Sequence, residues 1–278
     1  MQTRPVTTLN LELKTKNEKE EKNSEFLVHS SQLLLKGDPE YPKTATKLYM
    51  HAEESALVAS AETRIVDGTL LFSKKHSQKN SLEKELVTFC KVLFPRPIVY
   101  RLADINSREF AIELKVIQTI REKKGVKNLW IMFPFARTVQ ELREIKEKII
   151  QAGLHRSPTC KFWFMLEIPS HVIELERVIS VGIDGVCVNA NNISRLLRGT
   201  EKDTSIIDKQ TEATLWTYAK VIKTSHKYGI TSCFYKDSLY PEVLNKLIRL
   251  GITSLSVSPH VIERTRKLIS EAEKKVIQ

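Results

Sequence analysis

The sequence predicts a single closed barrel of eight parallel strands, each followed by a helix, the (β/α)8 or TIM barrel of the α/β class. Eight short apolar runs recur between residues 47 and 258, and segments with helical patterning alternate with them. Strands covered by helices read as nearly continuous aliphatic and aromatic runs. The length of 278 residues is close to the roughly 250 typical of such barrels. Together these observations indicate the barrel.

The expected strands are the apolar runs themselves. In chain order they are Lys47–Met50, Val66–Phe72, Pro97–Leu102, Asn128–Phe133, Lys161–Ile168, Asp184–Asn189, Thr231–Tyr235 and Ser254–Ser258. Barrel enzymes carry their chemistry at the C-terminal ends of the strands. Residues at or just after each run are therefore the candidates for function.

Start and stop signals place the helices between these runs. Ser107 is a candidate N-cap, and Thr138 with Glu141 three residues later has the spacing of a capping box. Glycines that precede apolar runs favour left-handed caps at the helix ends. The expected helices are 53–62, Leu82–Val92, Ser107 to about Lys124, Thr138 to near Gly153, His171–Val181, Thr211–Tyr228, Pro241–Leu250 and Val261–Val276.

Residues 1–43 differ in composition from the rest of the chain. The stretch Lys14–Glu25 contains few apolar residues, so it cannot bury enough surface to offset the entropy of ordering it. We expect residues 1–43 to form a flexible N-terminal arm that protease removes first, and residues 44–278 to form the barrel.

Charge and composition exclude several classes of protein. The formal charge of +11 comes from lysines and arginines interleaved with glutamates in helical segments, and no nucleic-acid motif accompanies them, so we expect no nucleic-acid partner. No apolar run approaches the ~20 residues of a membrane helix, which predicts a soluble, cytoplasmic protein without a membrane partner. Widely spaced cysteines argue against a disulfide scaffold and a cysteine-type zinc site.

Polar residues lie at or just after the ends of several expected strands. A buried arginine can hold a carboxylate or phosphate bidentately, and a glutamate beside an amide oxygen can hold a hard cation such as Mg²⁺. A thiol at the mouth could move a proton. The candidates are Arg101 at the end of the third strand and Asp104 just beyond it, Arg137 after the fourth, Glu167 at the end of the fifth, Asn189 at the end of the sixth with Asn191 and Asn192 just beyond, and Cys233 in the seventh.

Structural alternatives exist for each candidate. Arg101 and Asp104 could form a structural ion pair, and Glu167 could accept only from backbone amides at the rim. Cys233 lies within a strand, where a free cysteine is most often a small buried apolar residue. The seven histidines show no metal-ligand spacing, which indicates surface or core residues.

The chain resembles the C-terminal barrel, binding phosphoenolpyruvate (PEP) or pyruvate, of PEP synthase and related PEP-utilising enzymes. Six segments that match in order cover almost all of residues 44–275. They are Thr44–Met50, Phe94–Phe110, Ile131–Leu142, Phe164–Ser170, Asp184–Leu196 and Ser254–Pro259.

The resemblance implies a role for each candidate. In that family the barrel binds PEP or pyruvate with Mg²⁺, and a phosphohistidine on a separate domain passes the phosphoryl group. The implied roles are substrate binding for Arg101 and Asn191, with Asp104 beside them, metal binding for Glu167 and Asn192, and protonation of pyruvate's enolate for Cys233.

The departures from the family pattern weaken that expectation. Asn192 stands in place of an aspartate ligand, so Mg²⁺ should bind weakly or not at all. Asn189 and Phe234 replace glycines, and Phe72 stands at the end of the second strand where the family has an arginine. A substrate-binding segment of the NPMLG-x-RG type is absent after the third strand.

We therefore expect a degenerate PEP-synthase-like barrel: a PEP- or pyruvate-binding or partner-regulating module with impaired catalysis. One alternative is an active phosphotransferase subunit that makes PEP from pyruvate with ATP-grasp and phosphohistidine domains supplied in trans. Another is a metal-dependent 2-oxo acid lyase, and a third is a protein-binding scaffold with a dead pocket. The sequence leaves open whether the chain forms a homodimer and whether its partner is a protein that carries the phosphohistidine.

Overall fold

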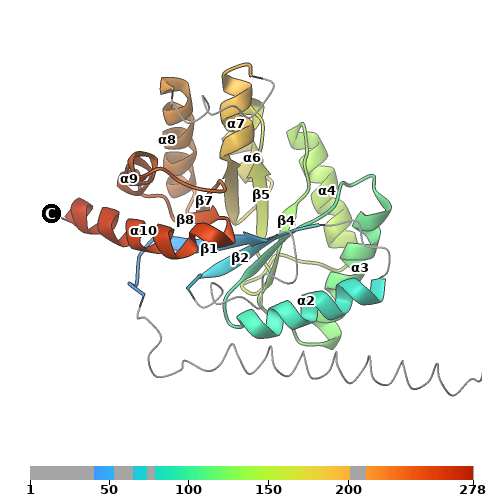
Figure 1. The fold of residues 1–278 in the computed structure, drawn as a ribbon. Helices are drawn as coiled ribbons and strands as arrows, with labels where there is room; N and C mark the ends of the chain where they lie inside the picture. The colour runs from blue at the N-terminus through green and yellow to red at the C-terminus, as the bar shows by residue number, and fades with distance from the viewer. Residues whose placement is uncertain (1–40, 53–64, 74–78, 201–210, 278) are drawn as a thin grey trace, which may run out of the picture. The chain divides into compact units, whose positions relative to one another are not determined.

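A computed structural model describes residues 41–52, 65–73, 79–200 and 211–277. Within these ranges eight parallel strands close into a barrel in which sequence neighbours pair and β8 pairs with β1, so the predicted fold is confirmed (Figure 1). The strands are β1 (Lys47–Ala52), β2 (Gly68–Phe72), β3 (Ile98–Arg101), β4 (Leu129–Phe133), β5 (Phe162–Leu166), β6 (Gly185–Asn189), β7 (Thr231–Tyr235) and β8 (Ser254–Val257).

Helices surround the barrel, and most of the described ones begin where the sequence predicts. Ser107 and Thr138 cap α3 and α4 through their side-chain oxygens, as expected. The described helices are α2 (Lys79–Leu93), α3 (Arg108–Lys123), α4 (Val139–Gln151), α5 (Pro169–Ile173), α6 (Leu175–Ser180), α7 (Ala190–Leu197), α8 (Glu212–Lys227), α9 (Pro241–Arg249), the 3-10 turn η4 (Pro259–Val261) and α10 (Ile262–Ile277).

Two helical predictions need correction. The single helix expected over His171–Val181 is two helices, α5 and α6, because Glu174 has φ −91° and ψ 20°, outside the helical region. The segment after β6 also forms a helix, α7, which the sequence reading missed. Asn189 caps α7 by accepting the backbone N–H of Asn192 at 3.1 Å. The expected helix 53–62 and nearly all of the predicted arm lie outside the described residues.

The core has two layers, separated by the strands. Strand residues that face outward pack against the helices, and their neighbours along the strand face the barrel interior. Tyr100, for example, is buried toward α3, whereas the next residue, Arg101, faces the interior. The buried interior cluster consists of Tyr49, Leu70, Val99, Met132, Trp163, Met165, Cys187 and Cys233.

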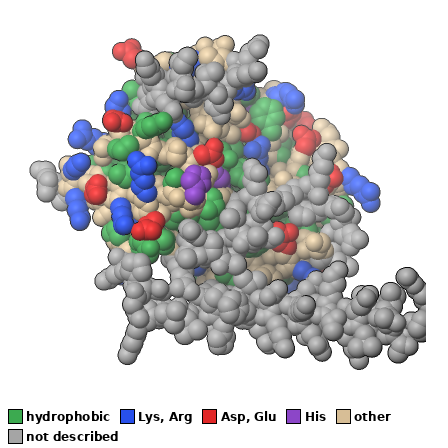
Figure 2. Space-filling view, in the orientation of Figure 1, with side chains coloured by type: hydrophobic (Ala, Val, Ile, Leu, Met, Phe, Trp, Pro, Cys, Tyr) green, Lys and Arg blue, Asp and Glu red, His purple; other side chains and the backbone are tan. Residues whose placement is uncertain are grey.

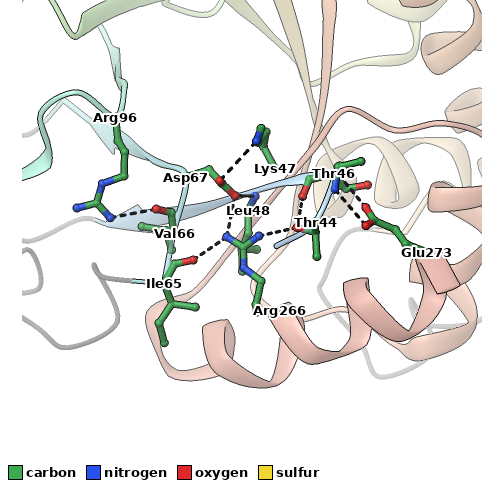
Figure 3. A network of polar contacts seen from close by, with 11 residues as sticks. Thr44, Thr46, Lys47, Leu48, Ile65, Val66, Asp67, Arg96, Arg266 and Glu273 are labelled. Carbon is green, nitrogen blue, oxygen red and sulfur yellow. Dashed lines mark hydrogen bonds and ion pairs between the residues drawn. The ribbon is translucent and has the colours of Figure 1, made fainter. Parts of the chain in front are cut away.

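A polar network joins α10 to the first two strands (Figure 3). The guanidinium of Arg266, whose side chain is 5% exposed, donates to Thr44 Oγ1 at 2.6 Å, to the Ile65 carbonyl at 2.6 Å and to Asp67 Oδ2 at 2.7 Å. Glu273 accepts two backbone N–H groups just before β1. The last helix is thereby fixed to the strand that closes the barrel.

The surface mixes charges of both signs. On the face shown in Figure 2, lysine and arginine side chains lie among acidic and hydrophobic ones, and no continuous basic field is visible there. No helix in the described ranges is long and apolar enough to span a membrane.

Candidate functional site

An arginine and a glutamate meet at the C-terminal mouth of the barrel. Arg101 is the last residue of β3, and Glu167 directly follows β5. Arg101 Nη2 lies 2.6 Å from Glu167 Oε2, and Nη1 lies 3.3 Å from Oε1. Their side chains are 20% and 10% exposed, so the pair is largely removed from water. The two opposite charges leave this part of the mouth neutral.

Two asparagines from the end of β6 and the start of α7 complete this cluster. Asn189 Nδ2 lies 3.5 Å and Asn192 Nδ2 lies 3.4 Å from Glu167 Oε1. The structure thus brings Arg101, Glu167 and Asn192 together, as the strand-end rule predicts. Asn191 is half-buried in the first turn of α7 and makes no side-chain hydrogen bond with any described residue. The binding roles assigned to these residues remain predictions.

The cluster around Glu167 offers one carboxylate and two amide side chains as candidate ligands for Mg²⁺. Mg²⁺ is usually held by one or two carboxylates together with waters and ligand oxygens. Here the single carboxylate is already neutralised by Arg101, and its neighbours are amides. Among the described residues, no group of three or more histidine, cysteine, aspartate or glutamate side chains could hold a metal ion. Weak or absent Mg²⁺ binding at this cluster stays a prediction.

Histidine 171 fixes the position of Glu167. Its Nδ1 accepts the backbone N–H of Glu167 at 3.2 Å, and its Nε2 lies 2.7 Å from the carbonyl oxygen of Ala136. Burial lowers the pKa of His171, which favours a neutral ring with Nε2 as the donor. The sequence reading treated this histidine as unremarkable. Its position four residues after a strand-end glutamate is the signal that could have singled it out.

A pocket of about 360 Å³ opens beside Arg101. Asp104, the other predicted substrate-binding residue after β3, lines this pocket and does not pair with Arg101; its Oδ1 accepts the backbone N–H of Asn106 at 2.9 Å. Arg137 is exposed and lies over the ring of Phe135, away from the pocket lining. The residues that line the pocket are Phe72, Ser73, Arg101, Leu102, Ala103, Asp104, Ser107 and Glu109.

Behind this pocket, the buried Glu113 of α3 joins the ends of β2 and β3. It accepts hydrogen bonds from Ser73 Oγ, from Tyr100 Oη at 2.9 Å and from the backbone N–H of Ala103 at 2.7 Å. Burial raises the pKa of Glu113, while these donors oppose the rise. Glu113 therefore supports two walls of the pocket. The sequence reading missed it, because a glutamate within a helix normally faces solvent.

Cys233 lies deep in the barrel interior. It is the middle residue of β7, has no exposed surface and is opposite Cys187 of β6. Burial and the neighbouring thiol of Cys233 raise the pKa of Cys187. The surroundings of Cys233 match the alternative of a small buried residue better than a thiol exposed at the mouth. Its catalytic role remains a prediction.

A second polar cluster lies at the ends of β1, β7 and β8. His51 Nε2 is 3.1 Å from Asp237 Oδ1 and 3.0 Å from Ser258 Oγ, and Ser258 Oγ is also 3.1 Å from Asp237 Oδ1. His51 Nδ1 faces Ser256 Oγ at 3.5 Å, and the imidazole contacts the ring of Tyr235, with centroids 4.5 Å apart. The sequence reading discounted the histidines for lack of ligand spacing, although His51 also lies in a strand-end position.

Comparison with known proteins agrees with this architecture. The PEP-binding domain of PEP-utilising enzymes matches residues 108–274, which is more than half of the chain. The probable PEP synthase of Staphylothermus marinus is 26% identical over 86% of this chain and 36% of its own length. The PEP synthase of Aeropyrum pernix is 26% identical over 71% of this chain and 29% of its own length. The chain thus spans about a third of these relatives.

Solved structures with low sequence identity share the fold. The HpcH/HpaI aldolase of Desulfitobacterium hafniense aligns with a TM-score of 0.56 and 10% identity, over 84% of this chain and 93% of its own. The citrate lyase beta subunit of Mycobacterium tuberculosis, solved with oxaloacetate and magnesium, aligns with a TM-score of 0.53 and 13% identity, over 81% and 97%. These likenesses concern the barrel alone. On the sequence match over residues 108–274, the chain belongs to the family of PEP-binding domains of PEP-utilising enzymes.

Proposed function

We propose that this barrel binds a small organic anion, a 2-oxo acid such as pyruvate or its enol phosphate PEP, at the mouth beside Arg101, and that its catalysis is impaired. The observation that carries this proposal is the guanidinium of Arg101, which is 20% exposed and lines a pocket of about 360 Å³. A guanidinium with restricted access to water is the side chain best suited to hold a carboxylate.

Arg101 can bind a ligand without leaving Glu167. Its guanidinium has five N–H donors, and the contacts with Glu167 and the Met165 sulfur use only part of them. Glu167 keeps the guanidinium at the mouth, where the remaining donors are available to a carboxylate. Glu167 competes with the ligand for the guanidinium, because its negative charge weakens the attraction of Arg101 for a second anion. We therefore expect the barrel to bind its carboxylate ligand weakly.

Impaired catalysis follows from what surrounds Arg101. Stabilising an enolate or transferring a phosphoryl group needs positive charge near the reacting oxygens. The cluster around Glu167 is neutral and lacks a second carboxylate for Mg²⁺, and the Cys233 thiol is buried in the interior. In this proposal the barrel binds its ligand, or regulates a partner protein in response to it, without completing the synthase reaction alone.

Titration calorimetry with PEP, pyruvate and oxalate, each with and without Mg²⁺, tests the proposal. We expect the wild type to bind at least one of these anions. The double variant Arg101→Met/Glu167→Gln removes both charges together, so no charge is left buried and unpaired, and it should lose at least tenfold in affinity.

Arg137→Met is the matched control, because this exposed arginine also follows a strand but does not line the pocket. It should bind like the wild type. Binding that is unchanged in the double variant would contradict the proposed site. Turnover of PEP or pyruvate by the purified chain would contradict impaired catalysis.

A further inference from the structure

One aromatic ring lies next to the Arg101 guanidinium, and a second ring lies next to the first. Phe72 is the last residue of β2 and is paired in register with Arg101. Its ring centroid lies 6.0 Å from Arg101 Cζ, and its ring contacts that of Tyr235 edge-on at 5.5 Å. Both rings are only partly buried against the interior cluster. Arg101, Phe72 and Tyr235 therefore form a continuous row of side chains across the mouth.

The polar cluster around His51, at the ends of β1, β7 and β8, supports Tyr235 at the far end of this row. The imidazole of His51 contacts the Tyr235 ring at 4.5 Å and is itself fixed by Asp237 and Ser258. His51 is 6% exposed, so its position leaves little freedom for the ring of Tyr235 to turn. Tyr235 in turn contacts the ring of Phe72 edge-on, so it helps to fix the ring that lines the pocket.

The charge of the pocket opposes a highly charged ligand. Arg101 is the one cationic side chain among the described residues that line it, and Asp104 and Glu109 line it as well. The charge of Arg101 is further offset by Glu167, 2.6 Å away. A trianion such as PEP would meet one neutralised guanidinium and two carboxylates. A monocarboxylate needs only a single guanidinium contact.

The size of the pocket also suggests a ligand larger than pyruvate. Pockets of roughly 300–1,000 Å³ typically enclose drug-sized molecules, and this one has about 360 Å³. A three-carbon acid held at Arg101 would leave the Phe72 ring exposed to water. An apolar tail of several carbons would cover it.

We propose that the mouth selects 2-oxo monocarboxylic acids with a branched or aromatic tail over pyruvate and over PEP. The carboxylate binds Arg101, and the tail lies on the ring of Phe72, which lines the same pocket. This selectivity rests on the proposed function, because it assumes that Arg101 anchors the ligand. It goes further by stating the substrate class, and it can fail while anion binding at Arg101 stands.

Calorimetric titration with a ligand series tests this selectivity: pyruvate, 2-oxobutyrate, 4-methyl-2-oxopentanoate, phenylpyruvate and PEP in one buffer. A methylene in an apolar pocket changes affinity by roughly tenfold or more. We expect affinity to rise along the 2-oxo acids, with 4-methyl-2-oxopentanoate or phenylpyruvate at least about tenfold tighter than pyruvate and PEP weaker than both.

Variants of Phe72 separate the two parts of the proposal. Phe72→Ala should remove most of the gain from the tail and leave pyruvate affinity within about twofold. Phe72→Arg adds a second guanidinium beside Arg101 and should reverse the order, so that PEP binds more tightly than phenylpyruvate. Trp216→Ala, which removes an exposed ring on α8, should change nothing.

The outcomes distinguish this inference from the proposed function. If pyruvate and PEP bind in an Arg101-dependent manner but longer tails give no gain, or if Phe72→Ala leaves the series unchanged in a folded protein, the selectivity is refuted and anion binding stands. If none of the five acids binds, both proposals fail together.

Discussion

Replacing Asn192 with aspartate should convert the Glu167 cluster into a Mg²⁺ site. In the structure Asn192 Nδ2 lies 3.4 Å from Glu167 Oε1. Two carboxylates at this separation repel by about 5 kcal/mol at an effective dielectric constant near 20, and Arg101 offsets part of this. Metal-free Asn192→Asp should therefore be less stable than the wild type. Mg²⁺ relieves the repulsion and gains a charged oxygen ligand.

The expected gain in Mg²⁺ affinity is about tenfold, or ~1.4 kcal/mol. Calorimetry measures it directly, and thermal unfolding with and without Mg²⁺ gives a second readout, because a ligand that binds the folded state raises the melting temperature. Asn191→Asp is the matched control: it adds the same charge one residue earlier, where the side chain makes no contact with Glu167.

Equal Mg²⁺ responses in Asn192→Asp and Asn191→Asp would refute the assignment of Glu167 and Asn192 to one shared site. Tight Mg²⁺-dependent PEP binding by the wild type, without a gain in Asn192→Asp, would show that the asparagine is itself an adapted ligand. Phosphotransfer should not appear in either variant, since one carboxylate supplies neither the missing positive charge nor a phosphohistidine.

Three further predictions concern stability and reactivity. Arg266→Met breaks a buried ion pair and should lower the free energy of unfolding in urea by about 3 kcal/mol. Lys267→Met removes an exposed ion pair on the same helix and should change the free energy of unfolding far less. Because burial raises the pKa of Glu113, the folded state binds a proton more tightly than the unfolded state. The free energy of unfolding of the wild type, relative to that of Glu113→Gln, should be greatest below the usual glutamate pKa of ~4.3 and should fall as the pH rises above it. A rise with pH would contradict this. Cys187 should react with a thiol reagent only as fast as the protein unfolds, because it is fully buried with a raised pKa, and rapid modification of the native protein would contradict its placement.

The fold could be predicted because its signals are local. Each strand is a short apolar run, and caps such as Ser107 and Thr138 mark helix starts within four residues of sequence. Helix α7 was missed because its first turn, Ala190-Asn191-Asn192, reads as a loop. The preceding Asn189 acts as a helix cap, and Ile193 provides the buried side chain that holds the helix to the barrel.

The site could be predicted only in part, for a related reason. The strand-end rule found Arg101, Glu167 and Asn192, because parallel strands in a barrel bring their C-terminal ends together. It could not show that Arg101 pairs with Glu167 and not with Asp104, since that depends on which side chains face the interior. Contacts made across elements, such as those of Glu113, leave no local pattern in the sequence.

The most direct test of the central claim is to observe the Arg101 guanidinium while a ligand binds. In a ¹H–¹⁵N spectrum of arginine side chains, the Arg101 Nε–H signal can be assigned by its loss in Arg101→Lys. We predict that pyruvate or 4-methyl-2-oxopentanoate shifts this signal in a saturable manner, with the same dissociation constant as calorimetry, while the Arg137 signal stays in place. Saturable binding that leaves the Arg101 signal unmoved would contradict the account.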